Sequence, residues 1–569
     1  MLLKHIHIKH FRGIEELSLP LDDMCVLIGE NNSGKSTILD ALRTCLTRSL
    51  TRKGYVFDEY DYHLPDATSE PSKAKPIEIT LTFAENTIDE WPDETSQMLD
   101  KAEQVDDNGL RSVILKVTSA YDAALNNFAT NYDFLDLSGA ALPKAKNPRT
   151  IINLQQLAPT FYLSSLRDAA QEFKPRSQFW GPFVKALNID AEAQKEIEAA
   201  LHELNKKVLE RHTAFASIKE QLKKTADIIS LGEDDPVSIE TVPSKVFDIL
   251  SRTQVHLSSK TGAQIPIVRH GNGTQSLAVI LLFDAFLQNQ LEDGYGEHAA
   301  PILAMEEPEA HMHPSAAKAV GEMLRTLLGQ KIITTHSGDL LAGVPLKNIR
   351  RIRRKDGKIT AHYIEDGSLT TDELNKLDFK VRATRGSLLF ARCWLLVEGE
   401  TEAALLPECA RSMGIDLLAE GICCIEYSQV GIEKFIKFAN QLGIEWVVVA
   451  DSDPKGLSYL KSARQHLNGK QEAQHLCGLS HENIEIFLCN NGFGHIYEAT
   501  VSDQKRASII APQGSPDYWE QVTKAQANNT KPKNAIAVAE SMAAEKGANV
   551  PQLLKDIISK AQTLARSSA

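Results

Sequence analysis

The chain has 569 residues, of which 43% are hydrophobic and 24% charged, and its formal net charge is −13. Because one hydrophobic core does not extend over a chain of this length, we expect roughly three or four domains. The composition is that of a soluble globular protein, and no run of residues approaches the roughly 18 apolar positions of a membrane span. The negative charge argues against a protein that coats nucleic acid with its whole surface, but it allows a local basic groove.

The N-terminal sequence, MLLKHIHIKHFRG, alternates like a β-strand and has no continuous apolar core of the kind found in signal peptides. We therefore expect a cytoplasmic protein that does not bind a membrane. The eight cysteines show no C-x-x-C spacing and mostly fall in apolar segments. This pattern predicts buried thiols, and neither a disulfide framework nor a zinc site.

The strongest motif is GENNSGKST at residues 29–37, which matches the phosphate-loop pattern G-x-x-x-x-G-K-[ST]. An apolar run at 24–28 precedes it and an amphipathic run at 38–46 follows it, so we predict a strand, the loop and a helix in this order. Such a loop directs backbone N–H groups toward phosphates, with Lys35 placed for the β- and γ-phosphates and the Ser36 hydroxyl for Mg²⁺. The alternative is a surface turn rich in glycine and serine.

Further strands are predicted at residues 6–11, 77–83 and 112–117, where apolar residues alternate with polar ones or form short runs. Between about 182 and 230 apolar residues instead recur at spacings of three and four, which predicts a long amphipathic helical segment. Such an insertion packs either on a second subunit, the interpretation we prefer, or on its own domain as a helical hairpin.

Two polar segments are candidates for binding anions. HGNGTQS, at 270–276, comes just before an apolar helix predicted at 277–287, so its small residues and hydroxyls would lie at a helix N-terminus. The second segment, RRIRRKDGK, forms either a local basic groove or a solvated hairpin edge protected by its charge. Its basic residues are Arg350, Arg351, Arg353, Arg354, Lys355 and Lys358.

The segment PILAMEEPEAHMHP contains residues suited to nucleotide hydrolysis. Its short apolar run reads as a buried strand that ends in Glu306 and Glu307. Beside a phosphate loop, one such carboxylate can hold Mg²⁺ through water and the next can orient the attacking water. A further strand, at 331–335, leads to His336, which would lie within reach of a γ-phosphate.

The C-terminal third of the chain alternates strands with helices. Strands are predicted at 393–397, 422–425 and 446–450, with helices at 403–413 and 432–442 between them. This alternation implies a parallel sheet, whose sites lie at the carboxyl ends of the strands. The first strand runs into EGETE and the third into DSD, so both acidic clusters belong to that edge.

Four carboxylates at this edge are candidate metal ligands. Glu398 ends a strand and Glu402 follows one helical turn later, while Asp451 and Asp453, two residues apart, point to the same side of an extended segment. Oxygen ligands of this kind suit Mg²⁺ or Mn²⁺. Enough carboxylates for two ions roughly 4 Å apart would support in-line attack on a phosphodiester. Each acid could alternatively cap a helix or lie in a solvated loop.

These motifs, in this order, resemble a known combination of domains. The phosphate loop, GTQS, the acid pair and the histidine resemble an ABC-type ATPase of DNA-repair and chromosome-maintenance proteins, and VEGETE followed by DSD resembles the Toprim domain of topoisomerases, primases and several nucleases. Their combination is similar to the OLD (overcoming lysogenization defect) family of ATP-dependent endonucleases. The resemblance implies an α/β fold with an ABC-type ATPase at 1–181 and 236–384, an inserted helical dimerisation segment at 182–235, and a Toprim domain with a parallel sheet at 385–569.

The resemblance also implies roles for single residues. It assigns ATP binding to Arg12, Gly29, Asn31, Asn32, Ser33, Gly34, Lys35, Ser36, Thr37, Gly273, Thr274, Gln275, Ser276 and Glu306, with Ser36 on the metal, and ATP hydrolysis to Glu307 and His336. Two departures, GNGTQS in place of LSGGQ and Glu306 where aspartate is commoner, predict slow turnover. Asp61 is a guess for the Q-loop, and a surface-loop acid is its alternative.

In the Toprim domain the resemblance assigns catalysis and metal binding to Glu398, Glu402, Asp451 and Asp453. It adds Glu485 as a further metal ligand and Lys531, or else Lys533, as the lysine that stabilises charge on the cleaved phosphate. From the residues alone, Glu485 reads as an acid on a strand face and Lys531 as a base at the start of a helix.

The function implied is an ATP-regulated DNA endonuclease that needs Mg²⁺ or Mn²⁺, nicks or cuts DNA, and acts as a homodimer or larger homo-oligomer. Anti-phage defence or DNA processing is the expected role in bacteria, with a helicase or other defence protein as a candidate partner. A topoisomerase or primase is disfavoured, because little chain follows DSD to form a domain with a strand-cleaving tyrosine. A non-catalytic, ATP-dependent DNA sensor or clamp is the remaining alternative.

Overall fold

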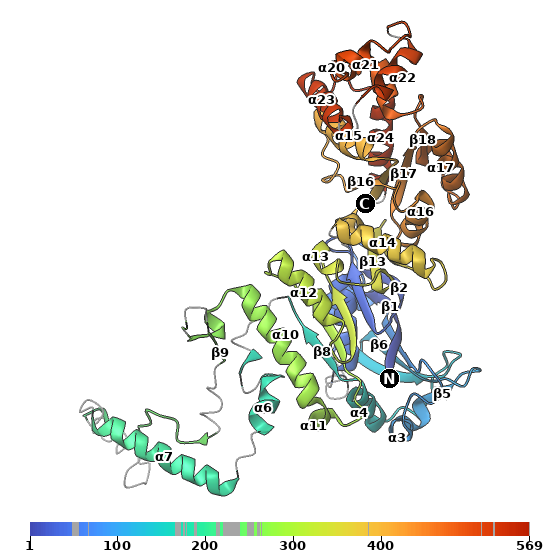
Figure 1. The fold of residues 1–569 in the computed structure, drawn as a ribbon. Coiled ribbons are helices and arrows are strands. Elements are labelled where there is room, and N and C mark those ends of the chain that lie inside the picture. The colour runs from blue at the N-terminus through green and yellow to red at the C-terminus, as the bar shows by residue number, and fades with distance from the viewer. Residues whose placement is uncertain are drawn as a thin grey trace. The chain divides into compact units, whose positions relative to one another are not determined.

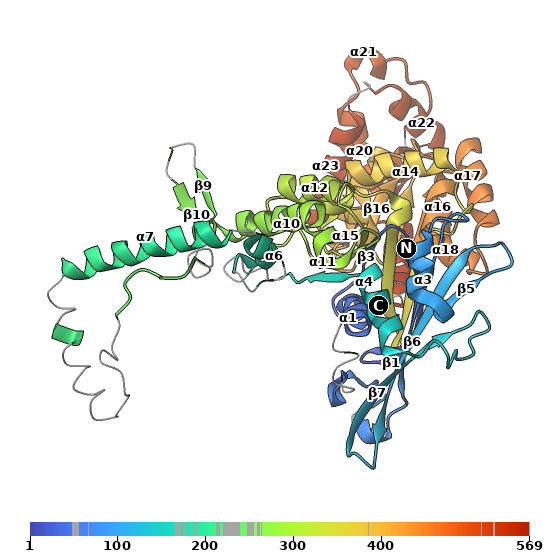
Figure 2. The same ribbon diagram turned by 90° about the horizontal axis from the view of Figure 1, so that it is seen from below.

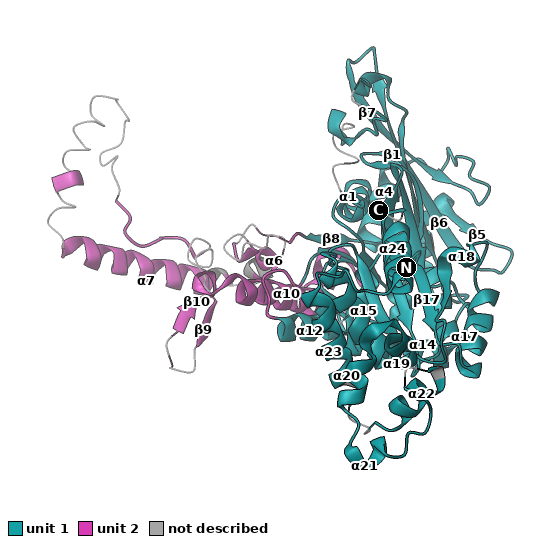
Figure 3. Cartoon of the chain, turned by 90° about the horizontal axis from the view of Figure 1, so that it is seen from above, with its two compact units in different colours: residues 1–163, 300–308, 314–569 teal, residues 164–299, 309–313 magenta. Residues whose placement is uncertain are grey.

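The computed structural model covers residues 1–569 and consists of two compact units (Figure 3). Unit 1 comprises residues 1–163, 300–308 and 314–569, and unit 2 comprises residues 164–299 and 309–313. The structure describes all residues except 48, 49, 51–55, 67, 166–171, 175, 176, 178, 187–189, 212–216, 220–238, 247–254, 259–261, 263, 385, 514, 527–529, 568 and 569.

Unit 1 begins with an antiparallel sheet, drawn mostly in blue and cyan (Figures 1 and 2). Its strand order is β2-β1-β4-β6-β5, and β7 pairs with β6. The sequence IEITLTFA in β4 alternates strictly between buried and half-buried positions, because one face of the sheet packs on the core and the other meets solvent. The strands are β1 (Leu2–Phe11), β2 (Ile14–Pro20), β4 (Ile77–Ala84), β5 (Glu103–Val105), β6 (Arg111–Asp122) and β7 (Asn127–Leu135).

A second sheet carries the phosphate loop at its centre. Its order is β14-β13-β3-β12-β11-β8, and all pairs except β13–β14 are parallel. Every residue of MCVLI in β3 is buried, as expected for a central parallel strand, and α1 (Lys35–Leu46) follows the loop, so the predicted strand, loop and helix are confirmed. The strands are β3 (Met24–Ile28), β8 (Thr160–Leu163), β11 (Ile302–Glu306), β12 (Gln330–Thr334), β13 (Ile349–Lys355) and β14 (Lys358–Tyr363).

The predicted parallel sheet in the C-terminal third is confirmed. Its order is β16-β15-β17-β18, and all three pairs are parallel. Its core combines apolar residues of β15, α15 and α24, including the fully buried Leu395 and Ile557. The elements are β15 (Cys393–Val397), α15 (Glu400–Ser412), β16 (Ile422–Glu426), α16 (Ile432–Gln441), β17 (Glu445–Ala450), α17 (Pro454–Gln465), β18 (Leu476–Gly478) and α24 (Gln552–Ser567).

The remaining described helices cover these sheets or connect them. In unit 1 they are α3 (Asp93–Leu99), α4 (Pro148–Leu157), α12 (Pro314–Leu324), α13 (Gly338–Leu341), α14 (Thr371–Ala383), α18 (Glu472–His475), α19 (Ile484–Leu488), α20 (Gly494–Ala499), α21 (Asp503–Arg506), α22 (Pro516–Lys524) and α23 (Lys531–Ala544). None of the described helices has the length and hydrophobicity that a membrane span requires.

Unit 2 contains the helical insertion predicted from the sequence. Helix α7 (Ala191–Glu210) begins after Asp190, whose side chain accepts hydrogen bonds from two main-chain N–H groups of the first turn. Its apolar positions are partly open, with Ile197 38% and Leu204 48% exposed. Much of the chain from 212 to 238 lies outside the described residues, so the second-subunit partner stays a prediction. The other elements are α6 (Trp180–Ala186), β9 (His256–Ser258), β10 (Gln264–Pro266), α10 (Asn272–Asn289) and α11 (Leu291–Tyr295).

The basic segment RRIRRKDGK forms the β13–β14 hairpin, but two of its arginines are nearly buried and do not lie at a solvated edge. Arg350 is 3% and Arg351 7% exposed. The Arg350 guanidinium pairs with Asp22, and Arg351 donates hydrogen bonds to the main-chain oxygens of Ala391, Leu442 and Gly443. The solvated hairpin edge was therefore wrong for these two residues. Arg351, with Arg353 and Arg354, lines the cavity beside the phosphate loop, and a local basic groove stays a prediction.

Arg351 connects the phosphate-loop sheet to the C-terminal sheet, since Ala391 precedes β15 and Gly443 precedes β17. We expect Arg351→Met to lower the free energy of unfolding of the C-terminal sheet by about 3 kcal/mol, because the substitution leaves buried carbonyl groups without donors. Urea unfolding followed by tryptophan fluorescence measures this loss, since Trp394 and Trp446 lie in that sheet. Lys355→Met, at an exposed position of the same hairpin, is the control; equal midpoints for both variants would contradict the prediction.

Candidate functional site

The phosphate loop is closely packed around its lysine. Gly29 has φ 150° and a Cβ there would lie 2.1 Å from the Ile352 carbonyl oxygen, so only glycine fits. Lys35 is 6% exposed, and its Nζ donates to the main-chain oxygens of Gly29, at 2.8 Å, and Glu30, at 2.7 Å. Burial lowers the pKa of Lys35 to about 8, and the nearby Glu307 and Glu30 oppose this shift. The ammonium therefore stands inside the loop, where an anion would compensate its buried charge.

The acid pair and the histidine lie beside this loop, as predicted. β11 and β12 are adjacent and parallel, so that Glu306 at the end of β11 pairs with Thr334. Glu307 has φ 41°, and its carboxylate lies 3.9 Å from the Nε2 of His336. Burial, followed by the charge of Lys35, lowers the pKa of His336, so the imidazole is neutral near pH 7. This arrangement brings a carboxylate and a neutral imidazole to the lysine of the loop.

Arg12 is fixed by two carboxylates beside α1. Its guanidinium donates to Asp61 and Asp40, and the distance to Asp61 Oδ1 is 2.8 Å. Asp61, the guess for the Q-loop, thus holds Arg12 in place, and no described contact links it to the acid pair. Asp40 was missed by sequence reasoning, although its position one helical turn after Ser36 places it on the loop side of α1.

A second residue missed from the sequence is Tyr162 on β8. The Arg43 guanidinium lies 4.7 Å from the centre of the Tyr162 ring. Burial raises the pKa of Tyr162, and Glu306, which accepts its hydroxyl hydrogen bond, adds to the rise. The tyrosine therefore orients the carboxylate at the end of β11, and no local sequence pattern indicates this contact.

The segment GTQS lies in unit 2, in the first turn of α10. The sequence predicted that the helix begins at Leu277, but it begins earlier, at Asn272. Gly271 is its N-cap, and the small and polar residues that follow form its first turn. Gly273 is required there, since a Cβ would lie 2.7 Å from the His311 carbonyl oxygen. Ser276 is buried, and Gln275 donates to the His270 carbonyl oxygen. The contact of Gly273, Thr274, Gln275 and Ser276 with a partner's nucleotide stays a prediction.

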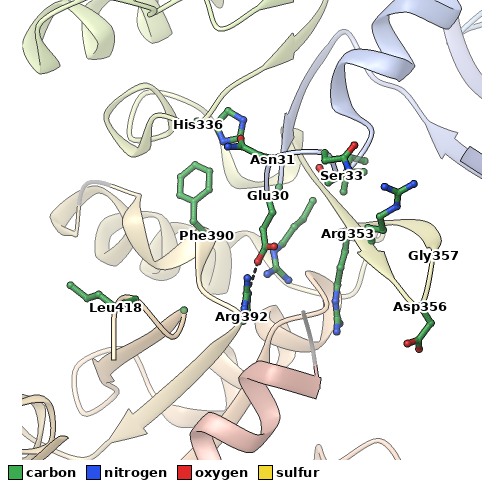
Figure 4. A pocket seen from close by; sticks show the side chains of 17 residues that line it. Glu30, Asn31, Ser33, His336, Arg353, Asp356, Gly357, Phe390, Arg392 and Leu418 are labelled. Atoms are coloured by element: carbon green, nitrogen blue, oxygen red, sulfur yellow. Dashed lines mark hydrogen bonds and ion pairs between the residues drawn. The ribbon is translucent and has the colours of Figure 1, made fainter. Parts of the chain in front are cut away.

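A cavity of about 680 Å³ extends between the phosphate loop and the start of the C-terminal sheet (Figure 4). Glu30, Asn31 and Ser33 line one side, and Phe390, Arg392 and Leu418 line the other. Glu30 forms an ion pair with Arg392, the residue before β15, across this cavity (Figure 4). The loop that is expected to bind nucleotide is thus tied to the first strand of the C-terminal sheet.

The acidic edge of the C-terminal sheet centres on Glu398 and Asp451. Glu398 follows β15 and Asp451 follows β17, and the two strands are neighbours in parallel register. Each residue has one buried carboxylate oxygen, Oε2 of Glu398 and Oδ1 of Asp451, with no hydrogen-bond partner among the described residues. Burial raises the pKa of Asp451 to about 8, and Glu402 and Glu398 contribute to the shift. The two acids predicted to share a site therefore do come together.

Glu402 and Glu485 complete the acidic cluster and are each 5% exposed. Glu402 Oε2 accepts the Gly399 N–H at 3.1 Å, which caps α15, and burial raises its pKa to about 7 with help from Glu485. Glu485 lies in helix α19, so the expectation of a strand face was wrong. The helix forms because Asn483 caps it, with its side chain accepting the Ile486 N–H.

Asp453 forms the contact that its alternative interpretation, a helix cap, predicted, and its role as a metal ligand stays a prediction. It is the N-cap of α17, and its Oδ1 accepts the Gly456 N–H at 2.6 Å. A Cβ on Gly456 would lie 2.1 Å from the Asp451 carbonyl oxygen, so this turn requires glycine. Asp453 thus turns toward the helix and not along an extended segment, while its charge still contributes to the raised pKa of Asp451.

Two family models match the chain over residues 1–453. A family model described as "Protein of unknown function (DUF2813)" matches residues 1–388, and one described as "Overcoming lysogenization defect protein-like, TOPRIM domain" matches residues 389–453. The chain belongs to the DUF2813 family. Its C-terminal sheet carries an OLD-like Toprim domain, which confirms the resemblance drawn from VEGETE and DSD.

Individual relatives extend over most of the chain. "Uncharacterized protein YbjD" of Escherichia coli (strain K12) is 29% identical over 579 residues, which cover 100% of both chains. "OLD nuclease" of Thermus scotoductus (strain ATCC 700910 / SA-01) is 26% identical over 474 residues, covering 79% of this chain and 82% of the relative. The solved Smc head domain with an extended coiled coil, bound to the C-terminal domain of ScpA and derived from Pyrococcus furiosus, has 15% identity and a TM-score of 0.38 and covers 67% of this chain and 99% of that chain.

The donor set of the OLD-like Toprim domain suits a divalent cation. All its candidate ligands are carboxylate oxygens, and Oε2 of Glu398 and Oδ1 of Asp451 are buried without a hydrogen-bond partner among the described residues. No three His, Cys, Asp or Glu side chains within the described ranges already surround one point closely enough to hold an ion. Lys531, as predicted, begins helix α23, but its side chain lies outside the described part, and Lys533 is exposed.

The raised pKa values predict how pH and Mg²⁺ affect stability. Folded Asp451 and Glu402, with pKa values of about 8 and about 7, retain protons that the unfolded chain releases at ordinary carboxylate pKa values. Without metal, stability should therefore fall as pH rises from about 5 to about 8, and added Mg²⁺ should raise the melting temperature more at about pH 8.5 than at about pH 6. Differential scanning fluorimetry measures both effects. Asp451→Asn should reduce them, and an unchanged Mg²⁺ effect in this variant would contradict the prediction.

Proposed function

We propose that this protein is an ATP-regulated DNA endonuclease whose Toprim domain cleaves phosphodiester bonds with Mg²⁺ or Mn²⁺. The observation that carries the proposal is the pair of buried, unpartnered oxygens of Glu398 and Asp451 at the ends of neighbouring parallel strands. The relative named as an OLD nuclease supports the class of reaction. Anti-phage defence or DNA processing in the bacterial cytoplasm is the role that the resemblance favours.

The acidic residues would have different roles at this site. Glu398 and Asp451 would hold the cation, with Asp453 and Glu485 contributing negative charge around it. A bound divalent ion supplies an activated water and neutralises charge on the phosphate. Glu402, whose pKa is raised to about 7, can take up or release a proton at its carboxylate near neutral pH. Lys531 would neutralise the cleaved phosphate from the start of α23.

The nucleotide site would use the residues around Lys35. The main-chain N–H groups of residues 29–37, the Ser36 hydroxyl and Arg12 would bind ATP and Mg²⁺, and Glu306 would hold the metal through water. Glu307 and His336, whose side chains are 3.9 Å apart, would orient the attacking water. GTQS of a second copy would close on this nucleotide, so we propose a homodimer or a larger homo-oligomer.

The ion pair between Glu30 and Arg392 gives nucleotide binding a route to the Toprim site. Lys35 Nζ donates to the Glu30 carbonyl oxygen, and ATP phosphates would compete for that ammonium. Arg392 directly precedes β15 and Glu398 directly follows it, so a shift of Glu30 would act on β15. Either activation or inhibition by ATP is compatible with this connection.

A non-catalytic, ATP-dependent DNA sensor or clamp is the alternative. One observation favours it: Glu402 and Asp453 each give an oxygen to a main-chain N–H group, as helix caps do. In this case the acidic edge would bind a cation or DNA without cutting. DNA cleavage assays separate the two functions directly.

Cleavage of supercoiled plasmid with Mg²⁺ or Mn²⁺ tests the nuclease. We expect Glu398→Gln and Asp451→Asn to reduce nicking at least about a hundredfold, because each removes a carboxylate on which the cation depends. Glu426→Gln, at the carboxyl end of the neighbouring strand β16, is the matched control and should cut normally. If the two acid variants cut as fast as this control, the activity does not arise from the proposed site.

ATP binding and hydrolysis are tested separately. Lys35→Ala should abolish binding of a fluorescent ATP analogue, and Glu307→Gln should retain binding while slowing phosphate release at least about tenfold.

Arg392→Gln should bind and hydrolyse ATP normally, but it should weaken whatever effect ATP has on DNA cleavage. Unchanged turnover in the Lys35 and Glu307 variants would refute the nucleotide assignment, and unchanged ATP control in Arg392→Gln would refute the connection.

A further inference from the structure

Helix α20 buries the side chain of Tyr497 completely. Its hydroxyl oxygen is buried as well and has no hydrogen-bond partner among the described residues. Buried polar groups are nearly always hydrogen-bonded, because an unsatisfied donor lowers stability. The Tyr497 hydroxyl is therefore a donor whose acceptor must come from the groups around it.

The charged groups around this hydroxyl belong to the acidic cluster. Burial, followed by the charge of Glu485, raises the pKa of Tyr497, and Cys489 and Glu402 add to the rise. Glu485 and Glu402 are themselves nearly buried. Among the carboxylates, Glu485 thus has the strongest effect on the phenol, and it is an acceptor that the hydroxyl can serve.

A kink between α19 and α20 brings Tyr497 back toward Glu485. In an unbroken helix the two residues would lie roughly 18 Å apart along the axis. Asn491 and Gly492 instead leave the helical conformation, and Gly492 has φ 101°, which favours glycine. Both helices pack on α22, as neighbours in the C-terminal helical group (Figure 1). The kink therefore places an acid from one helix and a phenol from the next in the same interior.

The main chain that carries Tyr497 is held by buried amide groups. Gln526 donates from Nε2 to the Tyr497 carbonyl oxygen at 3.1 Å. The fully buried Asn534, on α23, donates to Gln526 Oε1 at 2.7 Å and to Thr500 Oγ1 at 3.2 Å. These contacts fix α20 against α23, so the direction of the Tyr497 side chain is set by the fold.

Tyr427, a second fully buried tyrosine near the acids, shows what an ordinary structural hydroxyl does. Burial, followed by the charge of Glu398, raises its pKa. Its hydroxyl nevertheless donates to the Val449 carbonyl oxygen, at 3.3 Å, and so supports strand β17. The hydroxyl of Tyr497 makes no such main-chain contact in the described part of the chain.

We propose that Tyr497 is a positioning residue whose hydroxyl donates a hydrogen bond to the Glu485 carboxylate and holds it toward the cation site. The bond forms when Glu485 is ionised at an occupied site, because a carboxylate is then a strong acceptor. Donors behind a metal-site carboxylate fix its orientation, and their loss weakens metal binding roughly 10- to 100-fold. This inference rests on the proposed nuclease function and adds a residue that acts through Glu485.

Metal binding tests the inference without relying on cleavage. The full-length, nucleotide-free protein is titrated with Mn²⁺ by calorimetry, and we expect Tyr497→Phe to bind about tenfold more weakly than the parent. The melting temperature of the metal-free variant should not fall, because the hydroxyl that is removed has no partner among the described residues. Tyr518→Phe is the matched control and should bind Mn²⁺ normally, since its hydroxyl donates to Glu498, at 2.7 Å, in the same helical group.

A second substitution identifies the acceptor. In a Glu485→Gln background, Tyr497→Phe should change Mn²⁺ affinity less than about twofold, because the carboxylate that the hydroxyl orients is gone. An unchanged tenfold loss in this background would show that the hydroxyl acts through another group, such as Glu402, and would overturn the assignment to Glu485.

Plasmid nicking separates a positioning role from a structural one. Tyr497→Phe should raise the Mn²⁺ concentration for half-maximal nicking about tenfold, while the rate at saturating Mn²⁺ stays close to that of Tyr518→Phe. Equal Mn²⁺ affinities for these two variants, or a lower melting temperature with slower nicking at every Mn²⁺ concentration, would overturn the inference. The nuclease itself would then still stand if Asp451→Asn is inactive, whereas normal nicking by Asp451→Asn would overturn the proposed function.

Discussion

The concentration of negative charge at one edge of the C-terminal sheet is the constraint on which the site depends. Parallel strands β15 and β17 end side by side, so the residues that follow them, Glu398 and Asp451, meet where little water reaches. Helices α15 and α19 add Glu402 and Glu485, both nearly buried. Burial, and then the neighbouring carboxylates, raise the pKa of Asp451, and a cation would stabilise its charged form. Without a cation, ionisation of these carboxylates would therefore lower the stability of the fold.

Helix caps in the Toprim domain reduce the destabilisation caused by the clustered carboxylates. Glu402 and Asp453 each accept a main-chain N–H, so part of their negative charge is stabilised by the first turn of a helix. Lys455 neutralises Glu398 from the solvent side. These contacts leave Glu398 and Asp451 as the acids with unsatisfied oxygens, and the same elements that stabilise the fold define where a cation would bind.

The phosphate loop and the Toprim sheet are connected by arginines. Arg351 donates to main-chain oxygens that precede β15 and β17, and Arg392 pairs with Glu30 of the phosphate loop. Both contacts act at the amino ends of strands whose carboxyl ends carry Glu398 and Asp451. Strands β15 and β17 link the two ends, so the contacts from the phosphate-loop sheet and the acidic edge lie at opposite ends of the same strands.

Much of this arrangement was predictable, because its signals are local. GENNSGKST between an apolar run and an amphipathic run predicted a strand, a loop and a helix, and the alternation around VEGETE and DSD predicted a parallel sheet with acids at its edge. Other features depend on residues far apart in the chain. The burial of Arg350 and Arg351, the contact of Tyr162 with Glu306, and the Glu30–Arg392 pair, which spans 362 positions, follow no local pattern. The sequence by itself determined which side chains lie at strand ends and in the phosphate loop, since periodicity and glycine spacing are properties of short segments. Only the tertiary structure decided which carboxylate caps a helix, which one faces a lysine and which oxygens stay unsatisfied, because packing between distant segments sets those distances.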